Sequence, residues 1–258
     1  ALAMWLGILG AALALVVSDR LLQRALPQVA FVAPVETDAR GWWRSAVPMA
    51  MTEGMRILQA HLLIFLLGGM VALGEVGVFR VAVSTVLLVA MPLSLFNIVS
   101  MPVIARLHTA GQRAQLQRML TMVSLGMTAG VVLLSAPIFL VGEWLLVRLF
   151  GQDFATGNVA LSLLCVSAIV NALFGVNAAL LNMTGHQQRV TIASLAGLVV
   201  LVASAPLLIR SNGIEGAAVA NLLSVIAWCL FLWHDCRRLL GVEPGLVGLF
   251  WRPTDRTR

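Results

Sequence analysis

The sequence predicts an all-α membrane protein, a polytopic transmembrane helical bundle of about seven spans, and three observations support this. Of the 258 residues, 60% are hydrophobic and 11% are charged, whereas soluble domains carry roughly 25% charged residues. The mean hydropathy is +0.96, so the chain has more apolar side chain than one soluble core could bury. The apolar residues form long runs, with arginines mainly between them. These observations exclude a water-soluble enzyme, a secreted disulfide scaffold and a disordered chain.

Seven apolar runs are long enough, or nearly so, for a helix that needs about 20 residues to cross the roughly 30 Å hydrocarbon core. Their continuous apolar character excludes β-barrel strands, which alternate polar and apolar positions. The expected spans are residues 1–17, which looks truncated, 45–73, 79–105, 119–147, 158–183, 190–209 and 214–233.

The connections between these spans carry glycine, asparagine and other turn residues. Short connections are expected at residues 74–77 (GEVG), 151–154 (GQDF), 185–187 (GHQ) and 211–213 (SNG). Longer connections are expected at residues 18–44 and at the basic segment 106–118. Within the span 119–147, residues 126–130 (GMTAG) form a GxxxG motif, which predicts close helix packing.

Arginine supplies all 17 basic residues, and its uneven distribution predicts the orientation. With alternate connections on opposite sides, one side receives Arg20, Arg24, Arg40, Arg44, Arg106, Arg113, Arg118, Arg189, Arg237, Arg238, Arg252, Arg256 and Arg258. The other side receives Arg80, Arg148 and Arg210, and Arg56 falls inside a span. The positive-inside rule assigns the first side, and with it the C-terminal tail, to the cytoplasm. Because membrane topology accounts for the arginines, no nucleic-acid partner is expected.

Four units are expected along the chain. Residues 1–17 are the last helix of an N-terminal lobe, 18–44 a cytoplasmic connection, 45–235 a six-helix C-terminal lobe and 236–258 a cytoplasmic tail. An odd number of spans with an outward start is typical of a fragment, so we expect a missing N-terminal lobe of the same protein.

Four polar residues in the predicted spans are candidates for a substrate cavity: Glu53, Arg56, His61 and Asn97. Glu53 and Arg56 are three residues apart, so they can pair on one helix face. A charge near the bilayer centre costs about 2.5–3.5 kcal/mol, and such residues usually face the bundle interior or a wet cavity. The pair is therefore either a cavity wall that meets an anion or a self-neutralised pair near the cytoplasmic interface. His61 is either a proton-coupling group or a packing residue, and Asn97, at similar depth to the pair, is either a ligand contact or interhelical glue.

Motifs of enzymes and of metal sites are absent from the sequence. It contains no HExxH, P-loop, GxSxG or paired-aspartate pattern. Cys165, Cys229 and Cys236 lack the spacing of metal ligands. Cys165 and Cys229 lie in apolar runs and are interpreted as packing residues, and Cys236 is interpreted as a residue of the membrane interface. We therefore expect no enzymatic activity, no cofactor and no metal.

Five segments resemble, in order, motifs of the C-terminal half of the polysaccharide-biosynthesis (O-antigen, Wzx-type) flippases. This family belongs to the multidrug/oligosaccharidyl-lipid/polysaccharide (MOP) exporter superfamily, as do the MATE transporters and the lipid II flippases. The segments are 46–49 (AVPM), 74–82 (GEVGVFRVA), 100–107 (SMPVIARL), 149–154 (LFGQDF) and 213–220 (GIEGAAVA), so the resemblance covers about residues 45–235. The family often has an aspartate where this chain places His61.

The resemblance implies one lobe of a two-lobe MATE-like transporter with a central cavity. It implies a flippase of the bacterial inner membrane that moves undecaprenyl-pyrophosphate-linked oligosaccharide. The implied partners are this substrate, membrane lipids, the missing lobe and the polysaccharide assembly machinery. Arg56, with Asn97 at similar depth, is the residue expected to meet the diphosphate.

Three alternatives remain. A cation-coupled MATE-like drug exporter would use Glu53 as its carboxylate and would find Arg56 an obstacle. A polytopic membrane glycosyl- or acyltransferase would need acidic or metal-binding residues on its loops, which hold little besides arginine. A purely structural scaffold subunit would leave the Glu53–Arg56 pair unexplained.

Overall fold

The computed structural model describes residues 39–245 continuously, together with residues 10, 14, 17, 18 and 20. The chain divides into two compact units, Ala1–Trp42 and Trp43–Arg258, and nearly all described residues lie in the second. Every element among the described residues is helical, which confirms the all-α prediction. The expected span 1–17 and most of the connection 18–44 lie outside the described residues.

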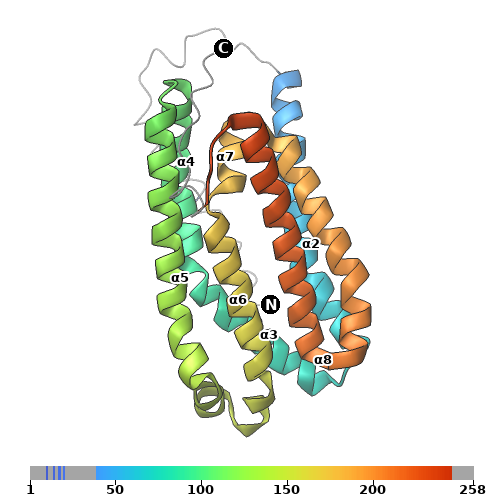
Figure 1. The fold of residues 1–258 in the computed structure, drawn as a ribbon. Helices are drawn as coiled ribbons and strands as arrows, with labels where there is room; N and C mark the ends of the chain where they lie inside the picture. Colours follow the sequence, from blue (N-terminus) through green and yellow to red (C-terminus); the bar gives the residue numbers. More distant parts are fainter. Residues whose placement is uncertain (1–9, 11–13, 15–16, 19, 21–38, 246–258) are drawn as a thin grey trace. The chain divides into compact units, whose positions relative to one another are not determined.

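Figure 1 shows the helices in chain order. They are α2 (Ala39–Gly68), α3 (Leu73–Val89), α4 (Met91–Thr109), α5 (Arg113–Phe150), the 3-10 helix η2 (Gln152–Gly157), α6 (Asn158–Phe174), α7 (Asn177–Met183) and α8 (Gln187–Leu240). Among the described residues, α2, α5, η2 with α6, and α8 are each long and apolar enough to cross a membrane. The bent pair α3 and α4 adds a fifth candidate, so the protein is a multi-pass membrane protein.

The helix α8 contains two of the expected spans. Its 54 residues would extend about 81 Å at 1.5 Å per residue, more than twice the thickness of a bilayer core. The backbone leaves the helical conformation at Asn212 and Gly213, where Gly213 has a φ of +53°. The first arm (residues 187–211) and the second arm (214–240) run side by side in opposite directions (Figure 1), and Ser224 donates a hydrogen bond to the carbonyl of Gly197 across them (2.7 Å). The expected turn at residues 211–213 is therefore the tip of a helical hairpin.

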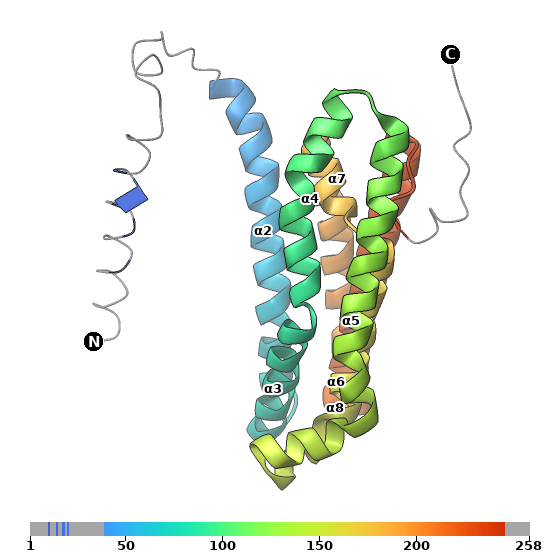
Figure 2. The same cartoon turned by 90° about the vertical axis from the view of Figure 1, so that its left-hand side faces the viewer.

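Two other expected spans are interrupted rather than continuous. The span expected at 79–105 falls on α3 and α4, which meet at a 43° bend next to Ala90 (Figure 2). Pro92 lies at the start of α4, where its missing N–H costs no helical hydrogen bond. The span expected at 158–183 falls on α6 and α7, which are separated by Gly175, with a φ of +74°, and Val176. Pro92 is a sequence signal of the first interruption, whereas the unbroken hydrophobicity of the run conceals the second.

Two connections differ from the prediction. The turn expected at residues 74–77 lies at residues 69–72, because α3 already begins at Leu73. Glu75 lies in the first turn of α3, where a carboxylate stabilises the helix dipole. The segment 106–118 is no long connection, since α4 continues to Thr109 and α5 begins at Arg113. Helix-forming residues at its two ends extend the neighbouring spans instead.

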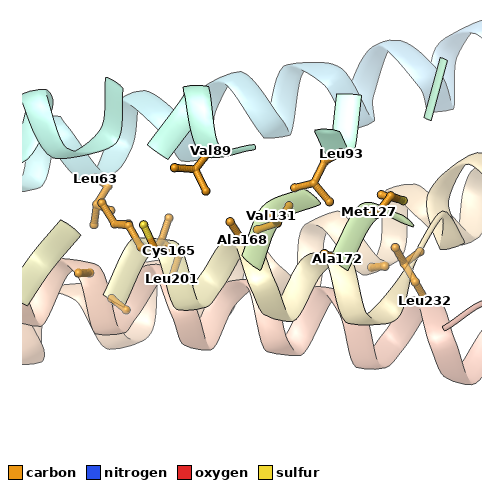
Figure 3. Close-up of a cluster of buried hydrophobic side chains, with 14 of the residues drawn as sticks. Leu63, Val89, Leu93, Met127, Val131, Cys165, Ala168, Ala172, Leu201 and Leu232 are labelled. Carbon is orange, nitrogen blue, oxygen red and sulfur yellow. The ribbon is translucent and has the colours of Figure 1, made fainter. Parts of the chain in front are cut away.

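The core lies where the helices meet, and small residues allow close approach. Figure 3 shows Leu63 of α2, Leu93 of α4, Val131 of α5 and Ala168 of α6 among the buried side chains. The GxxxG motif packs against α4 as predicted. A Cβ atom at Gly126 would lie 2.7 Å from the Phe96 ring, and one at Gly130 would lie 3.0 Å from Pro92. The three cysteines are free and buried, which confirms the interpretation of Cys165 and Cys229 as packing residues. The interpretation of Cys236 as an interface residue is wrong, because its side chain is buried between helices.

The chain turns back into the bundle after α8. Gly241 closes the helix in the left-handed conformation with a φ of +62°, a common helix ending that glycine adopts without strain. Residues 242–245 are buried, and Figure 1 shows this dark red segment running back from the end of α8 beside α6 and α7. We name residues 241–245 the C-terminal strap.

Candidate functional site

Polar contacts hold α2 against the first arm of α8. The carbonyl oxygen of Pro48 accepts hydrogen bonds from the hydroxyl of Thr52 on α2 (2.9 Å) and from that of Thr191 on α8 (3.0 Å). Gln59 follows Thr52 by two helical turns, and its amide donates to the carbonyl of Ser194 on α8 (3.3 Å). These contacts determine which face of α2 packs against its own lobe.

Glu53 and Arg56 form an ion pair on α2 that the rest of this lobe does not cover. The guanidinium donates from Nε to Glu53 Oε2 (2.9 Å) and from Nη2 to Oε1 (2.5 Å), which confirms the predicted pairing. The side chains of Glu53 and Arg56 are 55% and 69% exposed. Nη1 of Arg56 has no hydrogen-bond partner among the described residues. The pair can therefore meet an anion through the free edge of the guanidinium, or a cation through the carboxylate.

The remaining predicted site residues lie apart from this pair. His61 is exposed, and it follows Thr52 by about two and a half helical turns, so it projects from the opposite side of α2. Asn97 is half-buried on α4, and its amide donates to the carbonyl of Leu93 one turn earlier (2.8 Å). Among the described residues, neither His61 nor Asn97 makes a hydrogen bond to Glu53 or Arg56.

A surface hollow with a volume of about 510 Å³ lies at the bend of α5. The bend is centred on Val141, which has non-helical backbone angles, and the lining includes Glu143, Trp144 and Asn158. None of the predicted site residues lines it. The described residues also contain no group of three or more His, Cys, Asp or Glu side chains that could hold a metal ion.

Sequence reasoning missed the polar cluster that the C-terminal strap forms. Glu243 is 1% exposed, and its carboxylate contacts Trp233 and Arg237 of α8. On α7, Asn177 is 2% exposed, and neither polar atom of its side chain bonds another described residue. The one available signal was the acidic residue followed by Pro244 and Gly245 just beyond the last apolar run.

Comparisons with known proteins identify the fold. No protein-family model matches the chain, and no curated protein matches its sequence. A crystal structure of MATE in the bent conformation matches with a TM-score of 0.65 and 19% identity, covering 82% of this chain and 48% of that chain. A MOP superfamily transporter from Pyrococcus furiosus, whose binding pocket is described as having reverse polarity, matches with a TM-score of 0.60 and 18% identity over the same shares.

These likenesses show the architecture of the chain. It has the fold of a MATE and MOP superfamily lobe, as the resemblance implied. The chain spans about half the length of the solved structures that it matches. The Glu53–Arg56 pair is therefore exposed on a chain that corresponds to about half of each matched structure.

Proposed function

We propose that this chain is one lobe of a MOP superfamily transporter, and that this transporter is a flippase for undecaprenyl-pyrophosphate-linked oligosaccharide in the bacterial inner membrane. The shared fold supports transport, and motifs such as residues 100–107 and 213–220 support a lipid-linked glycan as the substrate. A second lobe of the same protein completes the cavity, and the polysaccharide assembly machinery supplies the substrate. The arginine-rich tail lies in the cytoplasm.

The exposed ion pair on α2 is the observation that carries this proposal. A charge on a membrane-spanning helix is costly in lipid and is stable where it faces a partner or a wet cavity. Glu53 and Arg56 are more than half exposed, so their own lobe does not shelter them. Facing the second lobe, Nη1 of Arg56 is free to bind a diphosphate oxygen, while Glu53 holds the guanidinium in place.

A cation-coupled drug exporter is the second candidate, and the exposure of Glu53 favours it. The carboxylate is 55% exposed beside the guanidinium, so it is accessible to a cationic substrate or ion from the same cavity. The flippase depends on Arg56, whereas the exporter depends on Glu53. This difference makes them separable by single substitutions.

The test uses the full-length protein with Arg56→Ala, Arg56→Lys and Glu53→Gln made separately. Two activities are measured in cells: the arrival of the lipid-linked glycan at the outer leaflet, and resistance to cationic drugs. The flippase proposal predicts that Arg56→Ala slows glycan arrival at least tenfold, a loss of about 1.4 kcal/mol in transition-state stabilisation. It predicts partial activity for Arg56→Lys, which keeps the charge but loses bidentate geometry, and near-normal activity for Glu53→Gln.

Arg80→Ala is the matched control, because Arg80 is also an exposed arginine on a membrane helix but lies on α3. It should leave glycan arrival unchanged. Full glycan transport by a well-expressed Arg56→Ala protein contradicts the proposed role of Arg56. Loss of drug resistance in Glu53→Gln, with no glycan transport by the wild type, establishes the exporter instead.

A further inference from the structure

The C-terminal strap is bonded to helices from three parts of the bundle. Its backbone pairs with α5, because Glu243 donates its N–H to Oε1 of Gln117 (2.8 Å) and accepts at its carbonyl from Nε2 of the same side chain (2.7 Å). One residue further, the carbonyl of Pro244 accepts from the hydroxyl of Ser124 (2.6 Å). Gln117 and Ser124 are two turns apart on α5, so they present their groups on one face of that helix.

The side chain of Glu243 bonds the strap to the second arm of α8. Its Oε1 lies 2.6 Å from Nε of Arg237, and its Oε2 accepts from Nε1 of Trp233 (2.9 Å). The guanidinium of Arg237 lies 4.8 Å from the centre of the Trp233 ring, so the three side chains form one cluster. Both oxygens of this buried carboxylate are bonded, which offsets the cost of burying its charge in this position.

The strap also contacts the break between α6 and α7. A Cβ atom at Gly175 would overlap the carbonyl of Pro244 and the hydroxyl of Ser124, and one at Gly245 would lie 2.8 Å from the carbonyl of Leu173. The backbone of the strap therefore lies directly against the backbone of the α6–α7 break, and the two contacts involve Gly245 of the strap and Gly175 of the break. The break is the one place where α6 and α7 have no continuous helical hydrogen bonding, so it is also where they can change their relative angle.

Next to this break, the packing leaves polar groups without partners. Asn177, the first residue of α7, is 2% exposed, and its Oδ1 and Nδ2 have no hydrogen-bond partner within the part of the chain that the structure describes. The thiol of Cys236, on the second arm of α8, lies 3.8 Å from the carbonyl of Asn177. Cys236 therefore lies at the contact between α7 and α8.

We infer that the C-terminal strap is a conformational latch. It clamps the end of α8 to α5 and to the α6–α7 break, and its release frees α7 to move relative to α8. The bonds that the strap makes to α5 and to the second arm of α8 hold this arrangement in place. This inference concerns the lobe itself and is independent of which substrate the transporter moves.

The test uses Cys236 as a reporter of the α7–α8 contact. The chain has three cysteines, so Cys165→Ala with Cys229→Ala leaves Cys236 as the single thiol. A second background keeps Cys165, which is buried in α6 away from the strap, as its single thiol. The rate of alkylation by N-ethylmaleimide is measured in membranes for the full chain with and without Glu243→Gln, and with and without Ser124→Ala.

The latch predicts local opening. Glu243→Gln should raise the alkylation rate of Cys236 about tenfold or more, which corresponds to roughly 1.4 kcal/mol of lost closed-state stability. Ser124→Ala removes one bond to the strap and should raise this rate by a smaller factor. In both variants the alkylation rate of Cys165 should stay unchanged. The matched control is Ser204→Ala, which removes a half-buried hydroxyl in the first arm of α8 that bonds the carbonyl of Val200 on its own helix instead of the strap.

Two results overturn the inference. If neither strap variant changes the alkylation rate of Cys236, the strap does not control the α7–α8 contact. If Cys165 and Cys236 become reactive in parallel, the substitutions loosen the whole lobe and the strap is ordinary core packing. Ser124→Ala keeps the test decisive if Glu243→Gln does not fold, because removal of one hydroxyl leaves no buried charge unpaired.

Discussion

The hydroxyl of Thr191 on α8 lies 3.0 Å from the carbonyl oxygen of Pro48 on α2 and donates a hydrogen bond to it. Thr52, whose hydroxyl lies 3.0 Å from that of Thr191, bonds the same carbonyl from within α2. This junction and the Gln59–Ser194 bond are the polar contacts that hold α2 to the first arm of α8. The position of the Glu53–Arg56 pair therefore depends on them.

Replacement of Thr191 should weaken the attachment of α2. Thr191→Val keeps the shape but leaves the Pro48 carbonyl with one donor fewer, at a cost of about 0.5–1.5 kcal/mol. The expected result is a lower thermal midpoint of the purified protein. Thr128→Val is the matched control, because the hydroxyl of Thr128 bonds only the carbonyl of Ser124 on its own helix. Equal midpoints for the two variants would show that the α2–α8 junction contributes nothing.

Close packing of α5 against α4 predicts a second difference in stability. Gly126→Leu would place its side chain where the Phe96 ring lies, and such overpacking costs typically 1–3 kcal/mol. Gly54→Leu, on α2, has no atom within 4 Å of the added Cβ and serves as the matched control. We expect a lower thermal midpoint for Gly126→Leu alone. If Gly126→Leu is as stable as the control, the close packing of Gly126 against Phe96 contributes nothing to stability.

The orientation of the lobe predicts where fused reporters are active. A green fluorescent protein at the C-terminus should fluoresce, because the arginine-rich tail is predicted to lie in the cytoplasm. Alkaline phosphatase inserted at Asn212, the tip of the α8 hairpin, should be active, because that tip is on the opposite side. An active phosphatase at the C-terminus together with an inactive one at Asn212 would show that the predicted orientation is wrong.

Hydropathy and arginine spacing were sufficient to predict the helical bundle. Charge is costly in lipid, so each span is recognisable by itself as an apolar run with the arginines outside it. The turn at Asn212 and Gly213 was predicted because those residue types favour turns. Pro92 marks the bend next to Ala90 in the sequence, because proline often kinks a span. The break at Gly175 was not predicted, since the apolar run continues through it. Hydropathy records which residues avoid water and carries no information about the angle between two helices.

The candidate site was predictable where it depends on local spacing. Glu53 and Arg56 pair because residues three apart share a helix face, as the sequence indicates. The depth of Asn97 in the membrane stays a prediction, and its bonding was not predicted, since its amide bonds the carbonyl of Leu93 on its own helix. The strap cluster joins Gln117 to Glu243, and no local pattern connects residues 126 positions apart.

Complementation tests the central proposal most directly. The full-length gene is expressed in a strain that lacks its own O-antigen flippase, and surface polysaccharide is measured. The account predicts that the wild-type protein restores the surface polymer and that the Arg56→Ala protein, present in the membrane in equal amount, does not. Restoration by both proteins would contradict the role of Arg56. Restoration by neither, in a strain that assembles the cognate lipid-linked glycan, would contradict the flippase itself.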